Sequence, residues 1–302
     1  MGGDGFSRKT ASRLNEAIRL EYQPPHDFAA LLAFFTKRAI PGIERVDESS
    51  YRRVFALDGH VGELSVTHAA HGHALDLRID FADAAHIPDI VARVRRMFDL
   101  DADIAAINTH LGRHRQLKAC IARHPGQRLP GGWDGFEIAI RAVLGQQVTV
   151  AAARTLTERV VRKFGHEVAT PQSGKVHLFP TPETLAEADL SGLGITGARI
   201  ATLRAIAAAV RDGRVDFRAD RPLAEFVREW TALPGIGDWT AHYLAMRGLA
   251  HADAFPAADI ILRKAVARDG RPVPTRALEE LSQAWRPYRA YAVLHLWRST
   301  MA

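Results

Sequence analysis

The sequence predicts an α+β fold, with a small antiparallel-sheet N-terminal domain followed by a mostly helical domain. The chain has 302 residues, of which 47% are hydrophobic and 25% charged, so it can bury two cores of ordinary size. Up to residue 103, apolar and polar residues alternate in short runs with the period of strands. From Ile104 onward the apolar residues recur about every 3.6 positions, and Gly and Pro separate the segments, which is typical of short packed helices.

The first domain is predicted to span residues 13–103. Residues 14–22 alternate between polar and apolar positions, which predicts a strand, and Pro24 and Pro25 end this run in a turn. Asp27 is a suitable N-cap for the apolar-periodic helix that follows it. We therefore expect a strand, a turn and a helix at the start of this domain.

Further strands and a closing helix complete the predicted first domain. The apolar segment 54–66 is interrupted by Asp58 and Gly59, a pair that favours the tight turn of a β-hairpin. Residues 74–79 form another short β-like run, and residues 90–98 carry apolar side chains at helical spacing. This region is therefore expected to be rich in hairpins.

The second domain is predicted to span residues 104–302 and to be nearly all helical. The apolar residues of 136–144 share one helical face, and those of 156–164 share another. Residues 166–182 contain many Pro, Gly and polar residues, which indicates an exposed loop between helices.

The sequence predicts no targeting or membrane segment. The longest uncharged stretch, 142–153, is shorter than the roughly 20 residues of a bilayer-spanning helix. Residues 1–12 have no apolar region of the length found in secretory signals. We therefore expect these residues to be a flexible lead-in and the protein to be cytoplasmic.

Positive charge is concentrated in the second domain. The net charge is +6 and the isoelectric point is about 9.8. Residues 1–103 contain 13 Lys and Arg against 16 Asp and Glu, whereas residues 104–302 contain 27 against 18. A polyanion such as DNA is therefore expected to bind the second domain, with an affinity that falls as salt rises.

A glycine-rich segment, Leu233-Pro234-Gly235-Ile236-Gly237, lies between two apolar-periodic helices. Two glycines at this spacing allow a tight turn that leaves backbone N–H groups free at the start of the next helix. Such a turn can bind a phosphate-sized anion. The spacing alone leaves open an ordinary helix end followed by a turn.

Asp259 is the candidate catalytic carboxylate. It stands 22 residues after Gly237 and directly before an apolar run that begins at Ile260. The simplest interpretation is a helix N-cap. Capping and catalysis are compatible, because backbone donors hold an N-cap carboxylate rigid and favour its ionised form.

Several motifs together resemble the HhH-GPD superfamily of base-excision DNA glycosylases and, within it, the AlkA type. The two most specific are LPGIGDWTAHYLAMRG at 233–248 and DAFPAADIILRKAV at 253–266, which resemble the helix–hairpin–helix and the catalytic-Asp signature. The resemblance extends over nearly the whole chain, in the same order, through LEYQPPHDF, RRMFDLDADI, RLPGGWDGFEIAIRAVLGQQVTVAAA and WRPYRAYAVLHLW. It implies an HhH-GPD glycosylase core in the second domain, with the hairpin at 233–237.

The resemblance implies a role for each candidate site residue. Asp259 matches the essential carboxylate of the family, and the backbone of Gly235 and Gly237 matches the turn that grips a DNA phosphate. A monovalent cation at the carbonyls of Leu233 and Ile236 is left open, and no other cofactor is expected. The aromatic residues that match the base pocket are Trp239, Tyr243, Trp297 and, from the first domain, Phe34. Packing in a core is the alternative for each of them.

Three departures from the family pattern bear on the chemistry. Related bifunctional lyases have a catalytic lysine two residues after the second hairpin glycine, where this chain has Trp239, so strand cleavage through a Schiff base is not expected. The wedge that fills the gap left by an extruded base matches Gln147, where the AlkA prototype has an apolar residue. Because Cys120 is the one cysteine, a cysteine-ligated iron–sulfur cluster is excluded.

The resemblance therefore implies a monofunctional glycosylase that acts on alkylated purines in double-stranded DNA, as a monomer. A sibling glycosylase for other damaged or mismatched bases and a noncatalytic helix–hairpin–helix DNA-binding module are the alternatives. A metal site is disfavoured because no clear pattern of acidic or cysteine partners accompanies the clustered histidines, which are His60, His68, His71 and His73. Cys120 lacks the Pro-Cys-His-Arg context of alkyltransferases, which favours an inert thiol.

Overall fold

The computed structural model describes residues 12–13, 16–267 and 271–300, and it has the α+β architecture that the sequence predicts. Residues 1–11 of the predicted lead-in lie outside these ranges, and Ser12 belongs to the first strand. One antiparallel sheet has the strand order β1-β6-β5-β4-β3, and β2 also pairs with β6. Its strands are β1 (Ser12–Arg13), β2 (Ile18–Glu21), β3 (Glu44–Val46), β4 (Ser50–Leu57), β5 (His60–His68) and β6 (Ala74–Phe81).

The turn between β4 and β5 explains the register of the central hairpin. Asp58 (φ 45°) and Gly59 (φ 75°) both adopt the left-handed backbone conformation that a two-residue turn requires. The strands then pair antiparallel from Leu57 and His60 outward. The predicted hairpin is therefore confirmed, and the local sequence accounts for its register.

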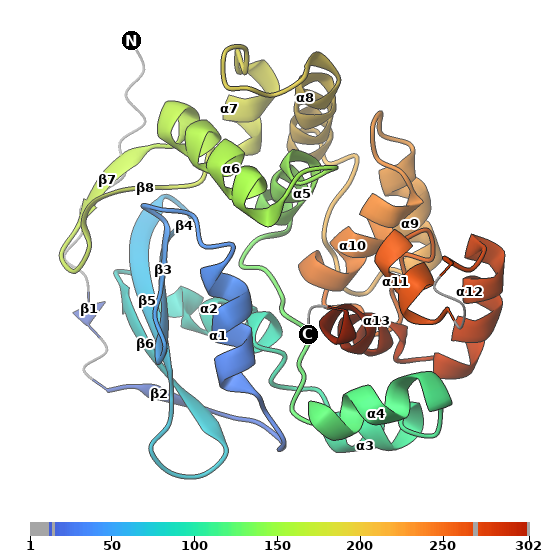
Figure 1. Ribbon diagram of the computed structural model, residues 1–302. Helices are drawn as coiled ribbons and strands as arrows, with labels where there is room; N and C mark the ends of the chain where they lie inside the picture. Colours follow the sequence, from blue (N-terminus) through green and yellow to red (C-terminus); the bar gives the residue numbers. More distant parts are fainter. Residues whose placement is uncertain (1–11, 14–15, 268–270, 301–302) are drawn as a thin grey trace.

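Two helices cover the face of the sheet that is turned toward the helical part of the chain (Figure 1). The first, α1 (Phe28–Thr36), begins at its predicted N-cap, because the Asp27 side chain accepts a hydrogen bond from Ala30 N at 3.0 Å. The second, α2 (Ile87–Met97), follows a short 3-10 turn, η1 (Ala84–His86). Their buried side chains and those of the sheet form one apolar core.

The remaining chain forms a helical domain around a second core. Among the described residues, no helix is both long enough and apolar enough to cross a bilayer. The helices are α3 (Ile104–Leu111), α4 (Arg115–Arg123), α5 (Gly135–Leu144), α6 (Val150–Phe164), α7 (Pro182–Glu187), α8 (Gly197–Arg211), α9 (Leu223–Thr231), α10 (Asp238–Gly248), α11 (Ile260–Ala265), α12 (Thr275–Ser282) and α13 (Arg289–Ser299), with a 3-10 turn, η2 (Gln283–Trp285), before α13.

The last helix, α13, runs through this second core. Every residue from Arg289 to Leu296 is buried, so the helix has neighbours around its whole circumference. It packs against α4 and α11 (Figure 1). This packing fixes the position of Trp297, which directly follows the buried stretch.

The segment 166–182 is not the exposed loop that its composition predicts. It contains a two-stranded hairpin, β7 (Glu167–Thr170) and β8 (Gly174–His177), which packs on the N-terminal sheet. Val176 and Leu178 share an apolar cluster with Val54 of β4, and Thr170 Oγ1 donates a hydrogen bond of 2.7 Å to Glu63 Oε1 of β5. The prediction was wrong because the apolar partners of these short strands belong to the other domain.

Arg128 fastens the connection between the two domains. Its side chain is 1% exposed. The guanidinium donates to the carbonyls of Asp99 (2.5 Å) and Ala102 (3.0 Å) on one side, and to those of Gln23 and Pro25 (3.0 Å) on the other. One buried side chain therefore donates hydrogen bonds to backbone carbonyls in two connecting segments, one between α2 and α3 and the other between β2 and α1.

Glu137 of α5 forms a second, ionic connection. Its carboxylate pairs with Arg53 of β4 at 2.7 Å and with Arg141 of α5 at 2.8 Å, and Arg141 also pairs with Glu44 of β3 at 3.2 Å. Burial alone would raise the pKa of Glu137, but the positive charges of Arg53 and Arg141 lower it. Arg141 also donates to the backbone carbonyl of Arg38, just after α1, at 2.6 Å. The sheet, α1 and α5 are thus tied together.

Replacement of Arg128 by Ala is expected to lower the free energy of unfolding by about 3 kcal/mol or more, because it leaves buried carbonyls without donors. Urea unfolding measures this loss. Arg52→Ala, which changes an exposed arginine of β4, is the control and should stay within about 0.5 kcal/mol of the wild type. A loss below about 1 kcal/mol in Arg128→Ala would show that the junction does not depend on this side chain.

Candidate active site

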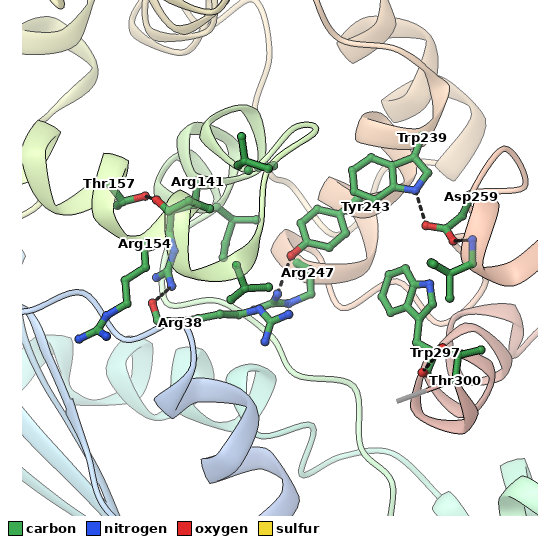
Figure 2. Close-up of a pocket in the computed structure, with 17 residues that line it drawn as sticks. Arg38, Arg141, Arg154, Thr157, Trp239, Tyr243, Arg247, Asp259, Trp297 and Thr300 are labelled. Carbon is green, nitrogen blue, oxygen red and sulfur yellow. Dashed lines mark hydrogen bonds between the residues drawn. The ribbon is translucent and has the colours of Figure 1, made fainter. Parts of the chain in front are cut away.

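Asp259 is both a helix cap and part of a cavity wall. Its Oδ1 accepts hydrogen bonds from the backbone N–H groups of Ile261 (2.8 Å) and Leu262 (2.9 Å), which caps α11. Its Oδ2 accepts a hydrogen bond of 2.8 Å from the indole Nε1 of Trp239 on α10. The side chain faces a cavity although the residue is only 8% exposed (Figure 2). The simple interpretation of Asp259 as an N-cap is therefore correct, and it accounts for one of the two carboxylate oxygens.

The cavity has a volume of about 550 Å³, within the range of small-molecule sites. It lies where α10, α11 and α13 meet α5, α6 and the end of α1. It brings together four of the predicted site residues, which are Asp259, Trp239, Tyr243 and Trp297. The other residues that line it are Arg38, Ile138, Arg141, Ala142, Gly145, Val148, Val150, Ala153, Arg154, Thr157, Arg247, Ile261 and Thr300.

Two of the aromatic rings are stacked on each other. Trp239 and Tyr243 stand one turn apart on α10, with ring centroids 5.2 Å apart and ring planes within 9° of parallel. Trp297, on α13, belongs to a different wall of the cavity (Figure 2). Because the stacked rings are in contact, a planar ligand has to lie against this pair and not between its members.

Phe34 lies apart from this group. Its ring lines a neighbouring cavity of about 480 Å³, which shares Arg38, Val150 and Trp297 with the first. The guanidinium carbons of Arg38 and Arg247 stand 3.7 and 4.7 Å from the centroid of its ring. The structure therefore places Phe34 in contact with the arginines and not on the wall that carries Asp259.

Four arginines that the sequence analysis did not single out line the main cavity. Arg38, Arg141, Arg154 and Arg247 lie toward the end that is away from Asp259 (Figure 2). The best signal was the spacing of Arg247, which follows Trp239 and Tyr243 at steps of four residues and so shares their helical face. Positions on one face of a helix are expected to reach the same cavity.

The buried arginines change the ionisation of the cavity. Arg247 Nη1 donates a hydrogen bond of 2.9 Å to Tyr243 Oη, and burial lowers the pKa of Arg247. Burial alone would raise the pKa of Tyr243, but the positive charges of Arg247 and Arg38 lower it. Burial lowers the pKa of Arg38 to about 10, so this arginine still carries its charge at neutral pH.

The glycine turn between α9 and α10 has the conformation that the spacing predicts. Gly235 has a φ of +79°, and a Cβ atom there would lie 2.0 Å from Thr202 Oγ1. Gly237 is the N-cap of α10 and has no side chain to satisfy the first N–H groups of that helix. Ile236 N donates to Leu233 O at 3.2 Å, within the turn. The N–H groups at the start of α10 suit a phosphate. A cation at the carbonyls of Leu233 and Ile236 stays a prediction.

The turn that carries Gln147 is tied to the glycine turn. Gln147 is exposed and has a φ of 55°. The preceding side chain, Gln146, donates from Nε2 to Gly235 O and to Thr240 Oγ1, both at 3.2 Å. Arg199 of α8 donates to the backbone carbonyl of Gln146. Gln147, the predicted wedge residue, therefore lies outside the cavity lining, on a turn that these hydrogen bonds hold in place.

The remaining sequence alternatives concern a metal and a thiol. In the part of the chain that the structure describes, no group of three or more His, Cys, Asp or Glu side chains is arranged to hold a metal ion. His68 instead shares a hydrogen bond of 2.8 Å with the hydroxyl of Tyr22. Cys120 lies half-buried on α4, away from both cavities.

Comparison with known proteins assigns the chain to a family. Residues 17–134 match the AlkA N-terminal domain, and residues 140–289 match the HhH-GPD superfamily base excision DNA repair protein. The DNA-3-methyladenine glycosylase 2 of Escherichia coli is 33% identical over 281 residues, covering 92% of this chain and 95% of that protein. The chain belongs to the HhH-GPD superfamily of base-excision DNA repair proteins. The resemblance that its motifs carry is therefore confirmed.

Two further comparisons differ in what they support. A Mycobacterium tuberculosis protein, named "Probable bifunctional transcriptional activator/DNA repair enzyme AlkA", is 40% identical over 97% of this chain, but this chain spans only 58% of it. The solved structure titled "3-methyladenine dna-glycosylase from Archaeoglobus fulgidus" has a TM-score of 0.80 at 20% identity, covering 92% of this chain and 96% of that one. At that identity the likeness concerns the fold.

The two glycines of the turn are expected to respond differently to substitution by Ala. Gly235→Ala puts a side chain in the left-handed region and against Thr202, so the free energy of unfolding should fall by about 2 kcal/mol or more. Gly237→Ala meets no atom within 4 Å and should cost below about 1 kcal/mol. Urea unfolding compares the two variants. Equal losses would mean that the strain at Gly235 is not what shapes the turn.

Proposed function

We propose that this protein is a monofunctional DNA glycosylase that hydrolyses the N-glycosidic bond of alkylated purines, such as 3-methyladenine and 7-methylguanine, in base-excision repair. The observation that carries the proposal is the Asp259 carboxylate in the wall of an aromatic cavity that is large enough for a purine. The name of the Escherichia coli relative, a DNA-3-methyladenine glycosylase, supports the same activity, and the name of the Mycobacterium tuberculosis relative supports a role in DNA repair.

Binding of DNA would use the glycine turn and the positive charge of the helical part. The free N–H groups at the start of α10 are suited to one backbone phosphate. The excess of Lys and Arg in residues 104–302 would neutralise others, so affinity should fall steeply with salt. Extruding a nucleotide costs a few kcal/mol, and least for a damaged base that pairs poorly. Gln147 would occupy the gap and could hydrogen-bond the unpaired partner base.

The chemistry needs one carboxylate because the lesion supplies part of the activation. Alkylation at N3 or N7 gives the purine a positive charge, so the base can leave with the bonding electrons and become neutral. Asp259 would stabilise the positive charge that develops on the sugar and orient the water whose oxygen bonds to C1′. The proton of that water passes to the carboxylate or to solvent. The products are the free base and an abasic site.

The cavity does not select for cationic bases by charge alone. The aromatic faces attract a cationic base by about 0.5–2 kcal/mol per contact. The arginines at the other end of the cavity oppose a positive charge, but they offer donors to carbonyl oxygens. This favours, as a second candidate, a sibling specificity that includes neutral oxopurines such as hypoxanthine. Chromatography of the released bases distinguishes the two specificities.

Lyase activity is not part of the proposal. Trp239 stands at the position of the lyase lysine, and none of the described side chains that line the main cavity is a lysine. The abasic product should therefore keep an intact strand until it is treated with alkali.

Replacement of Asp259 by Asn is the central test. Asn still caps a helix, so the fold should persist, but loss of the charge should slow base release from methylated DNA by on the order of 100-fold or more. Single-turnover assays with excess enzyme measure the rate. The matched control is Asp103→Asn, which makes the same change at the N-cap of α3 and should leave the rate unchanged. A loss in Asp259→Asn of less than about tenfold would overturn the proposal.

A further inference from the structure

The two oxygens of the Asp259 carboxylate have different donors. Oδ1 accepts both backbone hydrogen bonds that cap α11. Oδ2 accepts from one described donor, the indole N–H of Trp239, at 2.8 Å. A donor to an ionised acceptor makes one of the stronger hydrogen bonds in proteins. The orientation of Oδ2 therefore depends on a side chain that belongs to another helix.

Trp239 is itself held in place. Its ring stacks on Tyr243, which accepts a hydrogen bond from Arg247, and the three residues follow one another along one face of α10. The N-cap of the same helix is Gly237, two residues before Trp239. The Trp239 indole thus links the first turn of α10 to the Asp259 carboxylate, which caps α11 (Figure 2).

We propose that Trp239 is a positioning residue for Asp259, whose indole N–H fixes Oδ2 toward the cavity, in addition to lining the cavity with its ring. This inference rests on the proposed function, because it assigns to Trp239 a share in the work of the carboxylate. It differs from the family-based role of Trp239, in which the aromatic face contacts the base.

Trp239→Phe separates these two roles, because Phe retains an aromatic ring and lacks the N–H donor. Loss of one hydrogen bond to a charged group should slow single-turnover base release by about tenfold or more. The affinity for DNA that already contains an abasic site should change little, because the glycine turn is intact. A fall in affinity with an unchanged rate would show that Trp239 only supports binding, and would overturn the inference.

Trp297→Phe is the matched control. It makes the same chemical change on another wall of the cavity, and the indole hydrogen bond to Asp259 is left in place. Its rate can fall through lost contact with the base, but that fall should persist in an Asp259→Asn background, because Trp297 does not act through the carboxylate. A Trp297→Phe loss that disappears in the Asp259→Asn background would contradict the inference.

A double-mutant cycle separates failure of the inference from failure of the proposed function. If Trp239 acts through the carboxylate, Trp239→Phe should cause no further loss in an Asp259→Asn background. If the two losses multiply, Trp239 acts independently and the inference is wrong, while the proposed function stands. If Asp259→Asn alone loses less than tenfold, the proposed function fails first.

A measurement without catalysis covers the case in which Trp239→Phe does not fold. In protein labelled with ¹⁵N-tryptophan, the indole N–H signal of Trp239 should move markedly in Asp259→Asn, because the charged acceptor is lost. The indole N–H signal of Trp297, on α13, is the internal control, and its chemical shift should change by less than one linewidth. An unmoved Trp239 signal would overturn the inference.

Discussion

The cavity depends on one buried carboxylate, that of Glu137, which holds the two domains against each other. Arg53 reaches it from the sheet and Arg141 from α5, and each charge offsets the cost of burying the others. Removing either arginine would leave a buried negative charge undercompensated. Because Arg141 also holds the backbone of Arg38, the group that joins the domains also sets the arginine end of the cavity. The same ion pairs therefore stabilise the contact between the domains and fix the shape of the cavity.

The two oxygens of the Asp259 carboxylate divide between the fold and the proposed chemistry. The helix needs only an acceptor for its first N–H groups, and Oδ1 fulfils that need. This leaves Oδ2 for the cavity, at a position that the short helix α11 fixes. A carboxylate on a loop would have to be ordered each time a substrate arrives, whereas a capping carboxylate is already in place.

The sequence allowed prediction of features that depend on local chemistry. The hairpin at Asp58 and the cap at Asp27 follow from the conformations that these residues favour, and motif order led to Asp259 and the α10 aromatics. Features that depend on distant partners were missed. The strands within 166–182 find their apolar partners on the other domain's sheet, and Phe34 contacts arginines from both domains. Local sequence patterns give no information on the contact between these strands and the sheet or on that between Phe34 and Arg247, because both join residues that are far apart in the chain.

The hydrogen bond from Gln146 to the carbonyl of Gly235 has a mechanical consequence if the protein binds DNA as proposed. The turn that carries Gln147 and the glycine turn are already joined to each other before any DNA binds. Little conformational entropy is then lost when the protein engages a new stretch of duplex. On the proposed function, the energetic cost of opening a base pair would then fall on the double helix alone, and Gln147 would enter most readily where a base is weakly paired.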